Sequence, residues 1–111
     1  MVDPGEVINP EIARSQIEGG IIYGLTAALF GKISVEKGRV IQSNFPDYQV
    51  LKLSGTPEID VAFIESGERI GGMGEVGLPP IAAAVCNAIY AASGRRIRQL
   101  PLIDQNFNIL A

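Results

Sequence analysis

Residues 71–80, with the sequence Gly-Gly-Met-Gly-Glu-Val-Gly-Leu-Pro-Pro, constrain the fold more than any other stretch of the chain. Glycines surround a single carboxylate, and glycine permits positive φ and the close approach of another backbone or a ligand. Two prolines then open an apolar run, and proline suits the first turn of a helix. The stretch therefore predicts a tight turn that presents Glu75 just before a helix. The alternative is a plain connector in which Glu75 is a solvated acid favoured by the helix dipole.

A long helix is predicted from Pro10 to about Phe30. Asn9 is a typical N-cap, and Pro10 suits the first helical position. Apolar residues recur at helical spacing and form one face: Ile17, Ile21, Leu25, Ala28 and Leu29. A glycine inside a helix costs roughly 1 kcal/mol relative to alanine. We therefore expect a close neighbour on this helix at its glycines, which are Gly19, Gly20 and Gly24.

A second helix is predicted over residues 79–93, with Gly94 just past its end. Its alanines predict close packing against a neighbour, and Cys86 is interpreted as a small buried hydrophobic residue. The apolar face consists of Ile81, Ala82, Val85, Ala88, Ile89 and Ala92. Three arginines follow, interpreted as a solvated cationic helix end or alternatively as an anion site: Arg95, Arg96 and Arg98.

The remaining chain predicts short strands. Residues 32–35 and 39–43 form a β-hairpin with Gly38 in the turn. The alternation of apolar and polar residues over 58–65 predicts a half-buried strand. Residues 98–102 are predicted to form a last short strand. Residues 50–53 are predicted to form either a short helix or a strand. The fold class is α+β, with two main helices packed on a small mixed or antiparallel sheet. Residues 1–103 form the domain and residues 104–111 a tail.

Composition narrows the possible chemistry. A net charge of -3 argues against a nucleic-acid partner, and no apolar run is long enough to cross a membrane. The chain has no histidine, which excludes catalytic triads and most metal sites, so no metal ligand is expected. Glu75 is then the best candidate for a general base. Gln16 is either an ordinary polar helix residue or an amide that reaches a buried polar ligand.

Several separated motifs resemble one known family. They look like the C-terminal part of the molybdenum-binding large subunit of the xanthine dehydrogenase and aldehyde oxidase family, of the isoquinoline 1-oxidoreductase β-subunit type. The resemblance covers nearly the whole chain up to Leu102. In order, the motifs are Asp3-Pro4-Gly5, Ile8-Asn9-Pro10, Gln16-Ile17-Glu18-Gly19-Gly20, Gln42-Ser43-Asn44-Phe45, Gly71-Gly72-Met73-Gly74-Glu75 and Arg98-Gln99-Leu100-Pro101-Leu102.

The resemblance implies an oxidoreductase that hydroxylates an aldehyde or an N-heteroaromatic carbon with oxygen from water. It implies that Glu75 is the catalytic base and that Gln16 and Gly74 contact the cofactor. The cofactor would be molybdenum–molybdopterin, in its cytosine dinucleotide form. The implied partners are the remainder of the large subunit and an iron–sulfur subunit, and the implied location is cytoplasmic rather than periplasmic.

The chain also departs from the family pattern. Val76 stands where many relatives have proline, and family large subunits are several-fold longer. We therefore expect a fragment that is inactive alone and does not hold the cofactor tightly. The alternative function is a non-catalytic interaction or structural module, which would use exposed apolar surface and could self-associate through it.

Overall fold

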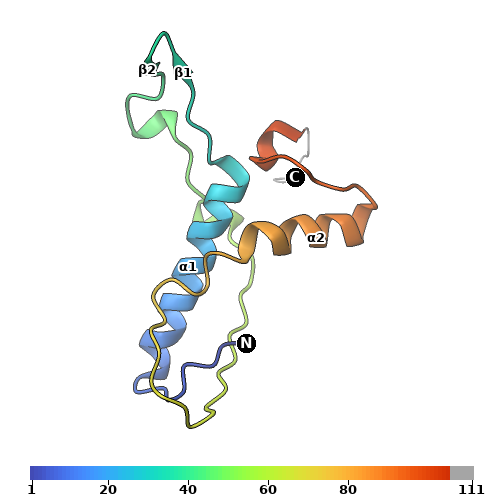
Figure 1. The fold of residues 1–111 in the computed structure, drawn as a ribbon. Helices are drawn as coiled ribbons and strands as arrows, with labels where there is room; N and C mark the ends of the chain where they lie inside the picture. The colour runs from blue at the N-terminus through green and yellow to red at the C-terminus, as the bar shows by residue number, and fades with distance from the viewer. Residues whose placement is uncertain (106–111) are drawn as a thin grey trace.

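The computed structural model describes residues 1–105 of the chain. Its central element is helix α1 (Pro10–Phe30), and Figure 1 shows helix α2 (Ile81–Ser93) beginning beside α1 and extending away from it to one side. Strands β1 (Val35–Glu36) and β2 (Arg39–Val40) form a hairpin beyond the C-terminal end of α1. The α+β class is thus confirmed. Three short 3-10 helices complete the fold: η1 (Phe45–Asp47), η2 (Leu53–Gly55) and η3 (Leu102–Gln105).

Helix α1 begins and ends where its sequence predicts. The Asn9 side chain accepts a hydrogen bond from the Ile12 N–H at 3.1 Å, which satisfies one of the free donors of the first turn. At the other end, the Gly31 N–H donates to the Ala27 carbonyl at 3.0 Å. The predicted apolar face is confirmed, because four of its members are buried and Ile21 is half-buried.

Helix α2 ends at a glycine of the expected conformation. Gly94 has φ +71° and donates its N–H to the Tyr90 carbonyl at 2.8 Å. Although the helix is strongly apolar, none of its residues is buried. Its alanine-rich outer side therefore has no packing neighbour among the described residues.

The apolar core lies where α1, α2 and η3 meet. Leu102 is 0% exposed and packs with Leu29 and Ile97. Cys86 is half-buried against this cluster, so its interpretation as a small packing residue is confirmed in part. The other partly buried members are Phe30, Leu51, Val85 and Ile89.

The hairpin is antiparallel, as predicted, but shorter. Val35 pairs with Val40 and Glu36 with Arg39. Lys37 and Gly38 both have positive φ, at 49° and 77°, which is the turn geometry that matches strand twist. Within the described residues the two helices pack against each other, and α1 also against η3, but neither packs against the hairpin. The hairpin thus projects from the end of α1, and the helices do not pack on it.

Two predicted strands are wrong. The expected alternation over residues 58–65 is present, with Val61 buried and Asp60 exposed, but only one bridge forms, between Val2 and Phe63. Among residues 1–105, no second strand lies alongside to extend the pairing. Residues 99 and 100 form a bend that leads towards η3, and Pro101 lacks the N–H that a strand residue would donate. The ambiguous residues 50–53 are extended up to η2.

The molecule is open for its size. Its radius of gyration is 16.7 Å, whereas a compact domain of this length has about 13 Å. Its accessible surface is 8248 Å², roughly 2,300 Å² more than the mass of the chain predicts for a compact monomer. No helix among the described residues has the length and apolarity needed to span a membrane.

The predicted tail lies mostly outside the described residues. Its first two residues belong to η3, where Asp104 pairs with Lys32 at 2.6 Å. The Arg95 side chain donates to the Gln105 carbonyl at 2.8 Å. The boundary at residue 103 stays a prediction.

Candidate functional site

The glycine loop (residues 71–77) packs its backbone directly on α1. A Cβ atom on Gly77 would lie 2.8 Å from the Ile17 carbonyl oxygen. A Cβ atom on Gly24 would lie 2.9 Å from the carbonyl oxygen of Leu78, which follows the loop. Both distances are too short for a real side chain, so only glycine fits at these two positions.

This contact explains one glycine of α1, Gly24, and places a second one against the loop. A Cβ on Gly20 would lie 3.5 Å from the Gly77 Cα, which is an ordinary van der Waals distance, so Gly20 faces the loop but leaves room for a methyl group. Gly19 is different, because a Cβ there would meet nothing within 4 Å. The predicted close neighbour is therefore confirmed for Gly20 and Gly24 and is wrong for Gly19. The neighbour is the chain's own loop.

Gln16 and Gly74, which the sequence places far apart, come together at the start of α1. The Gln16 Oε1 atom lies 3.9 Å from where a Cβ on Gly74 would be. Both residues line a shallow groove of about 290 Å³ between the glycine loop, the beginning of α1 and residues 4–9. Two of the three predicted site residues thus share one groove.

Glu75 lies beside this groove rather than in its lining. It is exposed, and its carbonyl accepts the Leu78 N–H at 3.0 Å, which closes a turn. In the described part of the chain, the Glu75 carboxylate has no hydrogen-bond or ion-pair partner. The side chain is therefore available to a group that enters from outside this chain.

The loop also offers unused backbone donors. The N–H of Gly71 donates to Pro4 and that of Leu78 to Glu75. Between them, the N–H groups of residues 72–77 have no acceptor among residues 1–105. A run of free N–H groups suits an anionic or acceptor-rich ligand. With the Gln16 amide nearby, this donor set fits a large polar cofactor.

Sequence reasoning missed Asp3, whose carboxylate supports the wall of the groove. Its Oδ1 atom accepts from the Gly5 N–H and from the Ser66 hydroxyl, both at 3.0 Å. The Gly5 N–H, followed by the Ser66 hydroxyl, lowers the pKa of Asp3 below its ordinary value of 3.8. The Asp-Pro-Gly triplet is typical of a turn, but no neighbouring residue in the sequence indicates that Asp3 also bonds to the distant Ser66.

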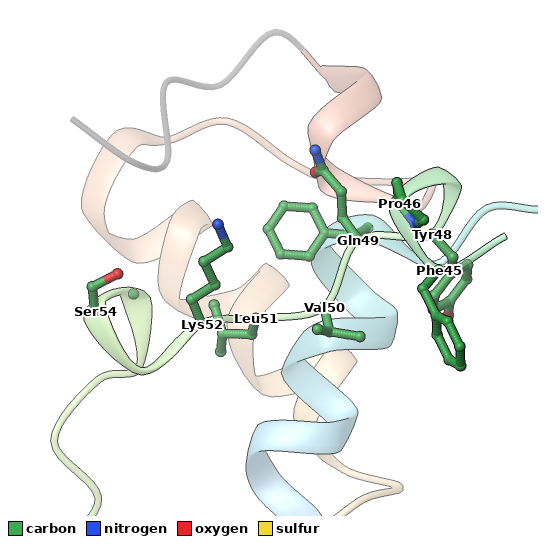
Figure 2. Close-up of a pocket in the computed structure, with 10 residues that line it drawn as sticks. Phe45, Pro46, Tyr48, Gln49, Val50, Leu51, Lys52 and Ser54 are labelled. Atoms are coloured by element: carbon green, nitrogen blue, oxygen red, sulfur yellow. The ribbon is translucent and has the colours of Figure 1, made fainter.

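A second, larger hollow lies at the other end of α1. Figure 2 shows Phe45 and Tyr48 grouped on one side of it, with Lys52 and Ser54 on the opposite side. Its volume is about 500 Å³. Phe45 is 94% exposed. Phe30, fourteen residues along α1 from Gln16, also lines this hollow, and the two hollows share no lining residue.

The described residues contain no cluster of three or more acidic, cysteine or histidine side chains that could hold a metal ion. Of the arginines after α2, Arg96 stacks on the Tyr90 ring at 3.6 Å and Arg95 bonds to η3. Neither contact indicates an anion site.

Comparisons with known proteins give the family. The molybdopterin cofactor-binding domain family matches residues 1–57, just over half of the chain. The isoquinoline 1-oxidoreductase subunit beta of Brevundimonas diminuta is 42% identical over 101 residues, which cover 91% of this chain and 13% of that protein. This chain therefore belongs to the molybdopterin cofactor-binding domain family, among the molybdenum-binding subunits of the xanthine dehydrogenase type.

Two further relatives extend the comparison. The aldehyde oxidoreductase molybdenum-binding subunit of Escherichia coli K12 is 33% identical, covering 88% of this chain and 14% of its own length. A protein of Gluconacetobacter polyoxogenes named membrane-bound aldehyde dehydrogenase (pyrroloquinoline-quinone) is 36% identical, covering 92% of this chain and 13% of its own. The chain thus spans about one-seventh of the length of these relatives.

Proposed function

We propose that this chain forms one wall of a molybdenum cofactor site in an oxidoreductase that hydroxylates an aldehyde or an N-heteroaromatic carbon with oxygen from water. The observation that carries the proposal is the convergence of Gln16 and Gly74 at one groove, beside a run of free N–H groups. The relatives named for isoquinoline and aldehyde oxidation support this choice of substrate class.

Each site residue then has a role. The Gln16 amide holds a polar edge of the cofactor, and Gly74 lets the loop backbone come close to it. The Glu75 carboxylate accepts a proton from the attacking hydroxyl, as a general base does. When bound, the cofactor supplies the two-electron oxidation. The cytosine dinucleotide form is part of the proposal, because its phosphates are acceptors that suit free N–H groups.

The open shape of the chain supports a proposal on partners. A surface excess of roughly 2,300 Å² is more than a standard protein–protein interface buries. We propose that the remainder of the molybdenum-binding subunit covers this surface, including the outer side of α2, and that an iron–sulfur subunit receives the electrons. The names of the relatives, which are subunits, support an assembly.

The same exposed side of α2 favours a second candidate function, a non-catalytic interaction module. One experiment separates the two. Glu75→Gln is made in the assembled enzyme, and Glu58→Gln is the control, because Glu58 is an exposed glutamate outside the loop and the segments that hold it. We expect Glu75→Gln to lower kcat by about 10²–10⁴-fold and Glu58→Gln to leave it unchanged.

Molybdenum content, measured by elemental analysis, is followed in both variants and is expected to stay at the wild-type level. Near-normal turnover in Glu75→Gln would remove Glu75 from the role of base and favour the interaction module. An active enzyme without molybdenum would contradict the cofactor assignment and point to a quinone, as in the name of the Gluconacetobacter relative.

A further inference from the structure

The glycine loop is fastened at both of its ends. At the second end, Gly77 sits against the Ile17 carbonyl of α1, with no room for a side chain. At the first end, the Gly71 N–H donates to the Pro4 carbonyl at 2.9 Å. Glu75 lies between these two anchors, so the position of its backbone depends on both. The anchor at Pro4 belongs to a segment whose role is otherwise unassigned.

That segment forms a clasp with the chain leading into the loop. We define the N-terminal clasp as residues 2–5 together with residues 62–71. Its first ties are backbone bonds: the Val2 N–H donates to Ala62 and the Ile64 N–H donates to Val2, both at 2.9 Å. The Gly67 N–H donates to the Gly5 carbonyl at 3.4 Å. The clasp thus pairs the N-terminal segment with the approach to the loop.

The side chain of Asp3 links the two segments of the clasp through one carboxylate oxygen. Asp3 Oδ1 accepts from the Gly5 N–H, which shapes the turn around Pro4, and from the Ser66 hydroxyl on the opposite segment. Gly5 has φ +80°, and a Cβ there would lie 2.8 Å from the Arg69 carbonyl oxygen. The turn is therefore pressed closely against the segment that leads to Gly71.

We propose that Asp3 is a positioning residue for the glycine loop: by bonding Gly5 and Ser66, it sets the Pro4 carbonyl that holds Gly71 and hence the place of Glu75. Asp3 itself does not touch the reacting groups. The catalytic part of this inference rests on the proposed function, in which Glu75 is the base. The structural part concerns only bonds within residues 2–71.

The test uses the assembled enzyme and two readouts. Hydrogen–deuterium exchange of the peptide covering residues 66–77 reports the Gly67 and Gly71 hydrogen bonds that hold the first end of the loop, and steady-state kinetics report turnover. Asp3→Ala removes the acceptor, whereas Asp3→Asn keeps an oxygen at the same place. Asp60→Ala is the matched control, because Asp60 is an exposed aspartate near the clasp without a bonded partner among the described residues.

We expect Asp3→Ala to speed exchange in this peptide roughly three- to tenfold, as loss of an ordinary hydrogen bond at an exposed site would. We expect kcat to fall by about tenfold with KM and molybdenum content unchanged, because the base is misplaced while the cofactor stays bound. Asp3→Asn should restore both values to near wild type. Ser66→Ala, which removes one of the two bonds, should give an intermediate effect.

Unchanged exchange in Asp3→Ala would overturn the proposal. So would faster exchange with an unchanged kcat in an enzyme that Glu75→Gln inactivates, since the loop would then move without effect on the base. Failure of the proposed function looks different, because Glu75→Gln itself would then turn over normally. In that case faster exchange in Asp3→Ala would still show that Asp3 holds the loop.

Discussion

The two helices contrast in a way that their sequences do not suggest. Helix α1 carries charged residues in its first half, at Glu11, Arg14 and Glu18, and six of its residues are buried, five of them in its second half. Helix α2 is apolar at every position except Asn87 and Ser93, yet none of its residues is buried. The difference lies in their neighbours: α1 is contacted by the glycine loop, α2 and η3, whereas α2 meets α1 and the core along one side only.

The contrast shows that the apolar content of a helix gives only its tendency to be buried. Whether the helix is buried depends on which other segments pack against it. Hydrophobic stabilisation scales with the area removed from water, so α1 contributes more to this fold despite its polar residues. The apolar outer side of α2 contributes only when another surface covers it. For this reason α1 belongs to the internal framework of the described residues, and we propose that α2 contacts the rest of an assembly.

The largest expected effect tests the buried side of the comparison. Leu29→Ala removes a core side chain of α1 and should lower the free energy of unfolding by about 2–5 kcal/mol. Val85→Ala removes two methyl groups from a half-buried side chain of α2 and should cost about 1 kcal/mol. Urea unfolding followed by circular dichroism measures both. Equal losses would contradict the difference between the helices.

The next effect concerns the glycines of α1. Gly24→Ala gains roughly 1 kcal/mol of helix propensity, but its Cβ would overlap the Leu78 carbonyl, and overpacking costs about 1–3 kcal/mol. We therefore expect a net loss of stability. Gly19→Ala meets nothing and should be stabilising. Thermal melting of the two variants measures the sign, and a stabilising Gly24→Ala would disprove the loop contact.

The smallest expected effect lies outside both helices. The N–H groups of Ser43 and Asn44, then the Ser43 hydroxyl, lower the pKa of Asp47 below 3.8. A lowered folded-state pKa gives stability that is present above 3.8 and is lost as the pH falls through the folded-state value. We expect acid to loosen residues 43–48 before the α1–α2 contact, which is apolar. NMR of the Ser43 and Asn44 amides from pH 6 to 2 measures this, with Asp47→Asn as the control.

Local rules predicted the parts of the fold that depend on neighbours in sequence. The Asn9 cap, the end of α2 at Gly94 and the hairpin turn at Gly38 are each fixed by one or two residues and their φ angles. The strand over residues 58–65 could not be settled in this way. Its alternation is real, but a strand needs a partner along its length, and only Val2 pairs with it.

The candidate site also has features that the local sequence predicts and features that depend on long-range contacts. Its residues could be named from the sequence, because a lone carboxylate among glycines and an amide on a glycine-bearing helix are visible locally. That Gln16 and Gly74 share a groove, that Glu75 lies beside it, and that Asp3 reaches Ser66 could not be seen. Each joins segments separated by many residues, and such contacts depend on how the chain folds back on itself.

By itself, the sequence determined the two helices, the hairpin and the family, and it gave the candidate residues of the site. Capping, turn chemistry and periodicity act within a few residues, so a sequence is enough to read them. Only the tertiary structure decided that the glycine loop lies on α1, that the N-terminal clasp bonds to its first end, and that none of residues 1–105 covers the outer side of α2. These features depend on which surfaces meet, and the free energy of burial belongs to both surfaces together.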